Sequence, residues 1–282
     1  MTHAINRAAI VSAVIVSTAF ESRAADIPIT GCGQTVPSAQ RGVLQSDLVC
    51  PVGAPGTGAV LLERNATLEL NGHRITGGFA GVAGTLGGQG PALYRVFGPG
   101  EITGAEIGID AQPTSEIGSL VVRDVSIHDN AQAGARASKQ LTATNVSADR
   151  NDVGLVANLL IARNVSANDN VRRVFPGAGL GISARQLRGR DITVTGNETV
   201  GIQTFAANVT RLLAIGNGDF GVHLCHRDAV SSLTDSTLIG NNGLARGVDI
   251  YATLRPHLHG TTCGKSASCS FGAPTLGVCA DD

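Results

Sequence analysis

The sequence predicts an all-β protein built as a parallel β-solenoid, a stack of similar coils made of short strands. A short motif recurs along the chain at intervals of 19 to 27 residues, which is a typical period for the coils of a solenoid. Within each copy, apolar and polar residues alternate with a period of two, as they do in strands and not in helices. The 282 residues include 37 glycines, and only 3% are aromatic and 15% charged. The core must therefore consist of small aliphatic side chains.

The first 24 residues predict a secretory signal peptide. Arg7 supplies positive charge, residues 8–20 carry no charge, and Ala24 ends a cleavage site of small residues. The apolar run is too short to span a bilayer as a helix. An N-terminal core helix is the alternative, and it fits these flanking residues less well. We expect a secreted protein, extracellular or periplasmic, that does not associate with a membrane.

Six cysteines agree with an oxidising compartment. Cys32 and Cys50 are expected to pair and to close an N-terminal cap over residues 25–59. The solenoid should occupy residues 60–260, and residues 261–282 form a Cys-rich tail. Three pairings remain open for the other four cysteines, Cys225, Cys263, Cys269 and Cys279.

Most copies of the motif end on an asparagine, and a glycine with an apolar residue follows shortly after it. The upstream positions Gly77 and Gly104 keep the same frame, so about eight coils are expected. We predict that each asparagine adopts a left-handed turn conformation and that neighbouring asparagines hydrogen-bond along the stack. A ladder of ligand-binding amides is the alternative, which glycine in the same position disfavours. The asparagines are Asn130, Asn151, Asn170, Asn197, Asn217 and Asn241.

The N-terminal part of the chain carries a resemblance to a known family. Cys32-Gly33, the stretch from Leu48 to Pro51 and the run from Ala66 to Gly77 resemble secreted right-handed parallel β-helix proteins of the pectate-lyase-like superfamily. The resemblance extends from about Cys32 to the C-terminus. It implies a single-stranded right-handed parallel β-helix and a polysaccharide ligand. The Arg-x-Pro-x-x-Arg motif of pectate lyases and the catalytic motifs of polygalacturonases are absent, so no catalytic residue is carried over.

Charge and metal-ligand patterns exclude several functions. A net charge of −1 gives no support for binding nucleic acid or an anionic membrane. The segment from His223 to His226, followed by His257 and Cys263, superficially resembles a metal site, but its spacings do not match those of zinc sites. No dense carboxylate cluster suggests calcium. We therefore expect no metal, no cofactor and a monomeric protein.

Arginines in the central coils are candidates for binding acidic sugars, because a guanidinium pairs with a carboxylate through two hydrogen bonds. The alternative is a solvated surface whose positive charge is balanced by Asp124, Asp149, Asp169 and Asp191. The arginines are Arg123, Arg136, Arg163, Arg185, Arg188 and Arg190.

Alignment of the coils predicts a catalytic cluster on their outer surface. If the glycine that opens each repeated strand is aligned, His223 and Asp249 should both point to solvent about 5 Å apart in adjacent coils. Tyr251 should lie diagonal to His223, with Arg185 two coils away. A histidine held by a carboxylate, a tyrosine that relays a proton and an arginine that neutralises a uronate are the groups that β-elimination needs. An exposed His–Asp pair without a catalytic role is the alternative.

Two functions are compatible with this pattern. The first is a secreted carbohydrate-active protein, a polysaccharide lyase or hydrolase acting on an acidic glycan. The second is a non-catalytic solenoid module that binds glycan or protein or has a structural role. The absence of Trp and the scarcity of Tyr favour this second function, because strong sugar stacking needs large aromatic rings.

Overall fold

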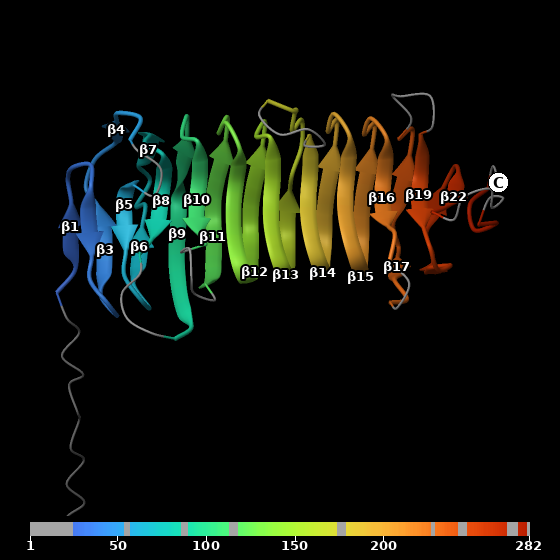
Figure 1. The fold of residues 1–282 in the computed structure, drawn as a ribbon, viewed down its shortest axis with the longest axis horizontal. Helices are drawn as coiled ribbons and strands as arrows, with labels where there is room; N and C mark the ends of the chain where they lie inside the picture. The colour runs from blue at the N-terminus through green and yellow to red at the C-terminus, as the bar shows by residue number, and fades with distance from the viewer. Residues whose placement is uncertain are drawn as a thin grey trace, which may run out of the picture.

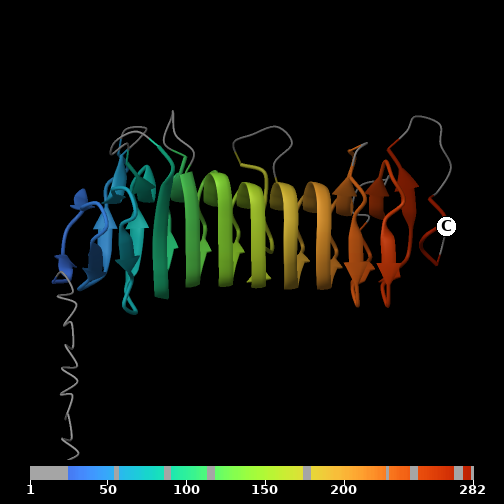
Figure 2. The ribbon, with the colours of Figure 1, turned by 90° about the horizontal axis from the view of Figure 1, so that it is seen from below.

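A computed structural model of the chain describes residues 25–53, 57–85, 90–112, 118–173, 179–226, 229–241, 247–269 and 276–280. The predicted signal peptide, residues 1–24, lies outside the described residues. The described chain forms one rod of stacked coils, which begins at β1 (Ile27–Ile29) and reaches β22 (Ser266–Ser268) near its other end (Figure 1). A view turned by 90° shows the same stacking along the rod (Figure 2).

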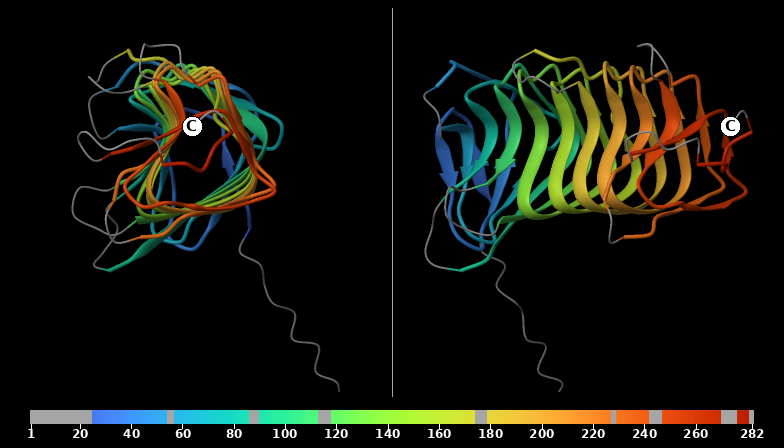
Figure 3. Two further views of the ribbon diagram at one scale, coloured as in Figure 1. Left: turned by 90° about the vertical axis from the view of Figure 1, so that its right-hand side faces the viewer. Right: turned by 45° about the vertical axis from the view of Figure 1, so that its right-hand side comes forward.

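Every strand pair in the described part of the chain is parallel, and each strand pairs with the strands one coil before and after it. Seen along the rod axis, the coils superimpose around one enclosed interior (Figure 3, left). The predicted fold class, an all-β parallel β-helix, is therefore confirmed.

Three faces of paired strands surround the interior. The first face carries the glycine that opens each repeat. It consists of β2 (Gln34–Val36), β5 (Gly58–Leu62), β8 (Ala80–Gly84), β10 (Ile107–Ala111), the beginnings of β12 (Ala133–Asp149), β13 (Val153–Ser166), β14 (Leu180–Thr195) and β15 (Val200–Ile215), and then β16 (Phe220–Leu224), β19 (Val248–Ala252) and β22.

The second and third faces complete each coil. The second consists of β1, β3 (Arg41–Leu44), β6 (Thr67–Glu69), the first parts of β9 (Ala92–Thr103) and β11 (Gly118–His128), the middle of β12 to β15, β17 (Ser232–Thr234) and β20 (His257–His259). The third consists of β4 (Leu48–Cys50), β7 (Arg74–Gly77), the ends of β9 and β11 to β15, β18 (Thr237–Ile239) and β21 (Thr262–Cys263).

The stack begins earlier than the repeated motif indicates. Strands β1 to β4 lie within residues 25–59, the segment expected to form a cap, and they already pair as coils. Gln34 to Val36, for example, pair in register with Val60 to Leu62. These first coils lack the asparagine of the later ones, so the repeat does not reveal them.

One aliphatic core runs through the rod, because alternate residues of every strand point inward. A column of apolar residues, each directly after the glycine that opens its strand, is buried, and its members face one another in adjacent coils. Val248, which follows Gly247, is also buried but pairs with Phe220 and not with Val222. Burial of one such side chain contributes about 1.5–3 kcal/mol. The column is Val82, Ile109, Ala135, Leu155, Ile182, Ile202 and Val222.

Single residues in the left-handed conformation turn the chain at two corners of each coil. Asp124, Asn145, Asn164, Asp191, Arg211 and Asp235 do so between the second and third faces. Between the third and first faces the residues with positive φ are Gly104, Asp129, Arg150, Asp169, Gly196, Gly216 and Gly240. The left-handed residue therefore directly precedes each repeated asparagine, and the prediction that the asparagines themselves adopt this conformation is wrong by one position.

The repeated asparagines form a buried hydrogen-bonded ladder along the rod, as predicted. Asn197 is representative, since its Oδ1 accepts hydrogen bonds from the backbone N (3.1 Å) and Nδ2 (2.8 Å) of Asn170. Its own Nδ2 donates to Asn217 Oδ1 (2.8 Å) and to the backbone oxygen of Ala167 (3.0 Å). The asparagine ladder, as we call it, comprises Asn130, Asn151, Asn170, Asn197, Asn217 and Asn241, all fully or almost fully buried.

The glycine that opens each strand leaves room for this ladder. A Cβ atom at Gly181 would lie 2.9 Å from Asn197 Nδ2 and 2.6 Å from the backbone oxygen of Gly201. Real Cβ contacts are almost never so short. Glycine therefore recurs at this position because a side chain would displace the ladder and the adjacent coil.

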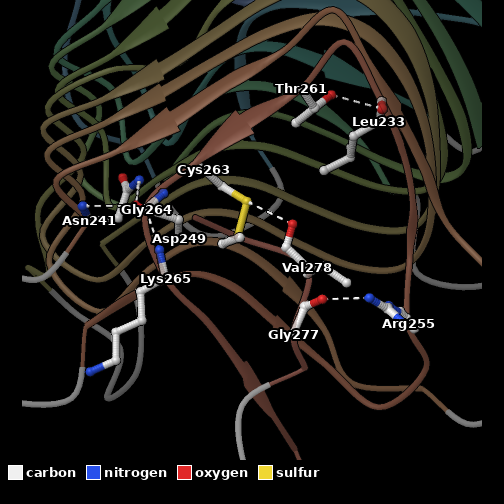
Figure 4. Close-up of a disulfide and its surroundings, with 11 residues drawn as sticks. Leu233, Asn241, Asp249, Arg255, Thr261, Cys263, Gly264, Lys265, Gly277 and Val278 are labelled. Atoms are coloured by element: carbon white, nitrogen blue, oxygen red, sulfur yellow. Dashed lines mark hydrogen bonds between the residues drawn. A yellow bond between two sulfur atoms is a disulfide. The ribbon is translucent and has the colours of Figure 1, made fainter. Parts of the chain in front are cut away.

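Asp249 ends the ladder at the C-terminal end of the rod (Figure 4). Its Oδ1 accepts hydrogen bonds from the backbone N (3.3 Å) and Nδ2 (2.7 Å) of Asn241, the same two kinds of donor that Asn197 Oδ1 accepts. Its Oδ2 accepts from the backbone N atoms of Gly264 (2.7 Å) and Lys265 (3.1 Å). A carboxylate, which only accepts, thus closes a chain of donors that points toward the C-terminus.

Three disulfides lie at the two ends of the described chain. Cys32 pairs with Cys50, as predicted. Of the pairings left open by the sequence, the structure contains Cys225–Cys269 and Cys263–Cys279. The first bridges the end of β16 to the last strand of the same face, and the second attaches the tail to β21.

Removal of the N-terminal disulfide should destabilise the first coils. Cys32 and Cys50 are 18 residues apart. A disulfide that closes a loop of this length stabilises the folded protein by about 3 kcal/mol, because it lowers the conformational entropy of the unfolded chain. We expect Cys32→Ala with Cys50→Ala to lower the free energy of unfolding by about that amount, measured by chemical denaturation. If the double variant were as stable as the wild type, the disulfide would not stabilise the protein by restricting its unfolded state, and the prediction would be wrong.

Candidate groove on the first face

An outer groove follows the corner where the first face bends into the second. Strands β12 to β15 pass through this corner without a break and give the curved ribbons of the central coils (Figure 3, right). The residues at the bend are small and almost fully buried, namely Ala137, Ala157, Ala184 and Thr204. Because no large side chain fills the bend, the outer surface is hollowed there over about 520 Å³.

Two columns of outward side chains form the walls of this groove. Val156, Ser183 and Gln203 face one another in adjacent coils of the first face and form one wall. Ser138, Asn158, Arg185 and Phe205, just beyond the bend, form the other. Coils repeat every ~4.8 Å along the rod, so the groove offers similar polar groups at regular steps to an extended ligand. None of its described lining residues carries a carboxylate.

Arg185 supplies the positive charge of the groove. Its guanidinium lies 5.7 Å from the ring centroid of Phe205, which is 39% exposed. Phe205 also contacts His226, and the two rings stack with centroids 4.5 Å apart. No carboxylate among the described residues lies within ion-pair distance of Arg185, whereas Arg136 in the same region pairs with Asp110 through two hydrogen bonds of 2.8 Å.

The predicted His223–Asp249 pair is wrong. The register sets His223 against Tyr251 and Val222 against Ile250, so Asp249 occupies the position of Gly221 and points inward. Asp249 is 4% exposed and its carboxylate ends the asparagine ladder. The sequence alignment matched Gly247 with Gly221, but in the structure Asp249 occupies the position opposite Gly221. The predicted register of this strand was therefore wrong by two residues, because the last coil has Asp where the earlier coils have Gly.

His223 and Tyr251 lie together on the outer side of the first face, in an aromatic cluster with Phe220. Tyr251 stacks on Phe220 with ring centroids 4.6 Å apart, and His223 lies 5.4 Å from each ring. Burial among these rings lowers the pKa of His223 below its ordinary value. The imidazole is therefore neutral at pH 7, the opposite of what a neighbouring Asp would produce. Of the four predicted site residues, His223 and Tyr251 lie together on the first face, Arg185 lies just beyond the bend in the wall of the groove, and Asp249 is buried in the ladder.

The disulfide beside His223 removes a metal-binding arrangement. His223, Cys225 and Cys269 bring one nitrogen and two sulfur atoms within 4.8 Å of one another. The two sulfur atoms are bonded to each other, so neither is a thiolate, the form that binds a metal ion.

A second depression, of about 560 Å³, lies toward the N-terminal end, on the corner between the second and third faces. Several of its polar residues pair with one another, since Arg74 Nε lies 2.6 Å from Glu101 Oε2 and His73 Nδ1 lies 3.5 Å from Asp47 Oδ1. Nearby, hydrogen bonds from Arg150, and then from His128, hold the pKa of Asp129 at about 2. These groups form an ion-pair network, which explains their positions without a ligand.

The sequence missed the groove but not its residues. The outward columns can be listed from the repeat, and they contain Ser183, Gln203 and Phe205. What the repeat did not reveal is that the small residues between the columns lie at a bend. The recurring alanines Ala137, Ala157 and Ala184 are the signal that could have found it.

Comparison of the chain with protein-family models, with curated proteins and with solved structures gives no match. The fold and the groove therefore define the class, a parallel β-helix protein with three disulfides and an axial surface groove. The disulfides are compatible with an extracellular protein. In the part of the chain that the structure describes, no helix is long and apolar enough to cross a membrane.

Proposed function

We propose that the protein is a secreted β-helix protein of the pectate-lyase-like superfamily that binds an acidic polysaccharide in the groove of the first face. The exposed guanidinium of Arg185 above Phe205, which pairs with no carboxylate among the described residues, carries this proposal. A guanidinium binds a uronate carboxylate through two hydrogen bonds, and an exposed ring face packs against the apolar side of a sugar. Amide and hydroxyl groups in the walls supply partners for sugar hydroxyls along the axis.

Binding without hydrolysis agrees best with the lining of the groove. Glycoside hydrolysis uses two carboxyl groups on either side of the bond that breaks, and the described lining residues include none. A second candidate function is β-elimination, supported by the neutral imidazole of His223 beside Tyr251. In that reaction His223 would accept the proton from the carbon next to the uronate carboxyl, the glycosidic C–O bond on the adjacent carbon would break to leave a C=C bond, and Tyr251 would supply a proton to the leaving oxygen.

A panel of polyuronates and neutral glycans tests both candidates. Retention of polyuronate without products supports the binding function. New unsaturated ends, measured by ultraviolet absorbance, would support a lyase, and new reducing ends alone would contradict both candidates in favour of a hydrolase. The wild-type protein should retain polyuronates and leave neutral glycans free.

Replacement of Arg185 by Gln should weaken polyuronate binding about 10- to 100-fold, because a charge-assisted hydrogen bond contributes about 1.5–3 kcal/mol. Isothermal titration calorimetry would measure the change. Lys139→Gln removes the same charge from an exposed residue outside the groove lining and should leave the affinity within about twofold. Equal losses in the two variants would mean that Arg185 acts only through net charge.

A further inference from the structure

Three arginines form an unbalanced positive surface on the second face of the central coils. Arg163 of β13 and Arg190 of β14 are register partners, and Arg188 pairs in the same way with Ile161. All three side chains are exposed. We call Arg163, Arg188 and Arg190 the arginine strip.

Adjacent placement of these charges is unfavourable in the free protein. Register partners in neighbouring parallel strands lie ~4.8 Å apart, and like charges directly opposite each other destabilise a sheet. The protein as a whole has a net charge of −1, so the excess of positive charge at the arginine strip is local and does not reflect the overall composition. An anionic ligand would remove the repulsion.

The nearest carboxylate does not neutralise the strip. Asp191, which follows Arg190 at the corner, accepts hydrogen bonds from Arg211 Nε (2.6 Å) and from the adjacent Arg211 nitrogen (2.8 Å). Those bonds, and then the charges of Arg211, Arg190 and Arg163, lower the pKa of Asp191. Among the described residues, no carboxylate lies within ion-pair distance of the three strip guanidiniums, whereas Arg136, Arg150 and Arg211 each have such a partner.

The surface between the groove and the strip is continuous. A depression of about 280 Å³ shares Arg185 and Phe205 with the groove and also includes Gln186 and Ala206. Gln186 and Ala206 in turn line a depression of about 390 Å³ that reaches Arg188. A chain that leaves the groove at Arg185 can therefore cross the corner to the second face.

We propose that the arginine strip is a second binding surface, which takes the anionic groups of a polysaccharide chain longer than the groove. The identity of this occupant rests on the proposed function of the groove. A polysaccharide is the occupant favoured, because the depressions that share Gln186 and Ala206 make the strip continuous with the groove. Short acidic oligosaccharides should engage the groove alone, and longer ones both surfaces.

The test compares the wild type with a double variant that carries both Arg163→Gln and Arg190→Gln. Long polygalacturonate should bind the double variant at least tenfold more weakly, and the slope of log affinity against log salt should fall by about 1.4–1.8, because each of the two lost anion contacts contributes roughly 0.7–0.9. A trimer, which should engage the groove alone, is expected to bind both proteins equally. The matched control is Arg172→Gln with Lys265→Gln, which removes two exposed charges elsewhere.

Dextran sulfate separates failure of this proposal from failure of the groove function. If the wild type retains dextran sulfate through Arg163 and Arg190 but binds no polyuronate, the groove function fails and the strip stands as an anion-binding surface. If the double variant binds both probes as tightly as the control variant does, the strip proposal is overturned. Duplex DNA that binds as tightly as polygalacturonate, with the same dependence on the two arginines, would also overturn the choice of a polysaccharide. Thermal unfolding of each variant verifies that these exposed substitutions leave the fold intact.

Discussion

Replacement of Asn197 by alanine is expected to lower the free energy of unfolding by about 4–5 kcal/mol. The side chain is almost completely buried in the middle of the asparagine ladder. Its removal leaves the backbone N and Nδ2 of Asn170 and the backbone oxygen of Ala167 without their partners. Each buried polar group left unsatisfied costs about 1–3 kcal/mol.

Chemical denaturation of the variant would measure this loss. Asn208→Ala is the control, because Asn208 is an exposed residue on the second face of the same region. It should change stability by less than about 0.5 kcal/mol. A loss below about 1 kcal/mol for Asn197→Ala would mean that water replaces the ladder bonds and that the ladder adds little to stability.

Asn197→Asp distinguishes the hydrogen bonds of the ladder from its packing. Aspartate has almost the same shape as asparagine but cannot donate to Asn217 Oδ1 or to the backbone oxygen of Ala167 when ionised. We expect it to destabilise the protein at pH 7 at least as much as alanine does, since it also places a charge in the core.

The repeat made the fold predictable because each coil imposes the same physical requirements. A residue such as Ile182 must be apolar to fill the core, Gly181 must lack a side chain, and Asn197 must both accept and donate. These three requirements recur in every central coil, so the sequence displays them as columns. The first coils meet the requirement for a core but lack the ladder, which is why they could not be recognised from the repeat.

The candidate site was predictable only in part, because nothing in the repeat fixes the outer surface. Alternation correctly placed His223 and Arg185 on the outside. It failed at Asp249, where one substitution in the glycine column changed the alignment by two residues. The groove itself depends on the curvature of strands at Ala157 and Ala184, and curvature is a three-dimensional property that the order of polar and apolar residues does not specify.

Replacement of Asp249 by alanine is expected to lower the free energy of unfolding by about 3–4 kcal/mol. Its carboxylate accepts four hydrogen bonds, two from Asn241 and one each from the backbone of Gly264 and Lys265 (Figure 4). Alanine leaves the two buried donors of Asn241 and the part-buried donors of Gly264 and Lys265 without this acceptor, at about 1–3 kcal/mol for each group that water cannot reach. Asp219→Ala, which changes a partly exposed carboxylate in the preceding coil, should cost less than about 1 kcal/mol.

Asp249→Asn tests why a carboxylate ends the ladder. An asparagine at this position can still present Oδ1 to Asn241, but its Nδ2 then meets the backbone N–H groups of Gly264 and Lys265, so that donor faces donor. We therefore expect a loss close to that of alanine, whereas Asp and Asn would be interchangeable if the side chain only filled space. Wild-type stability in Asp249→Asn would contradict this account. Loss of glycan binding in a variant that remains folded would instead return Asp249 to the functional surface, from which its burial removes it.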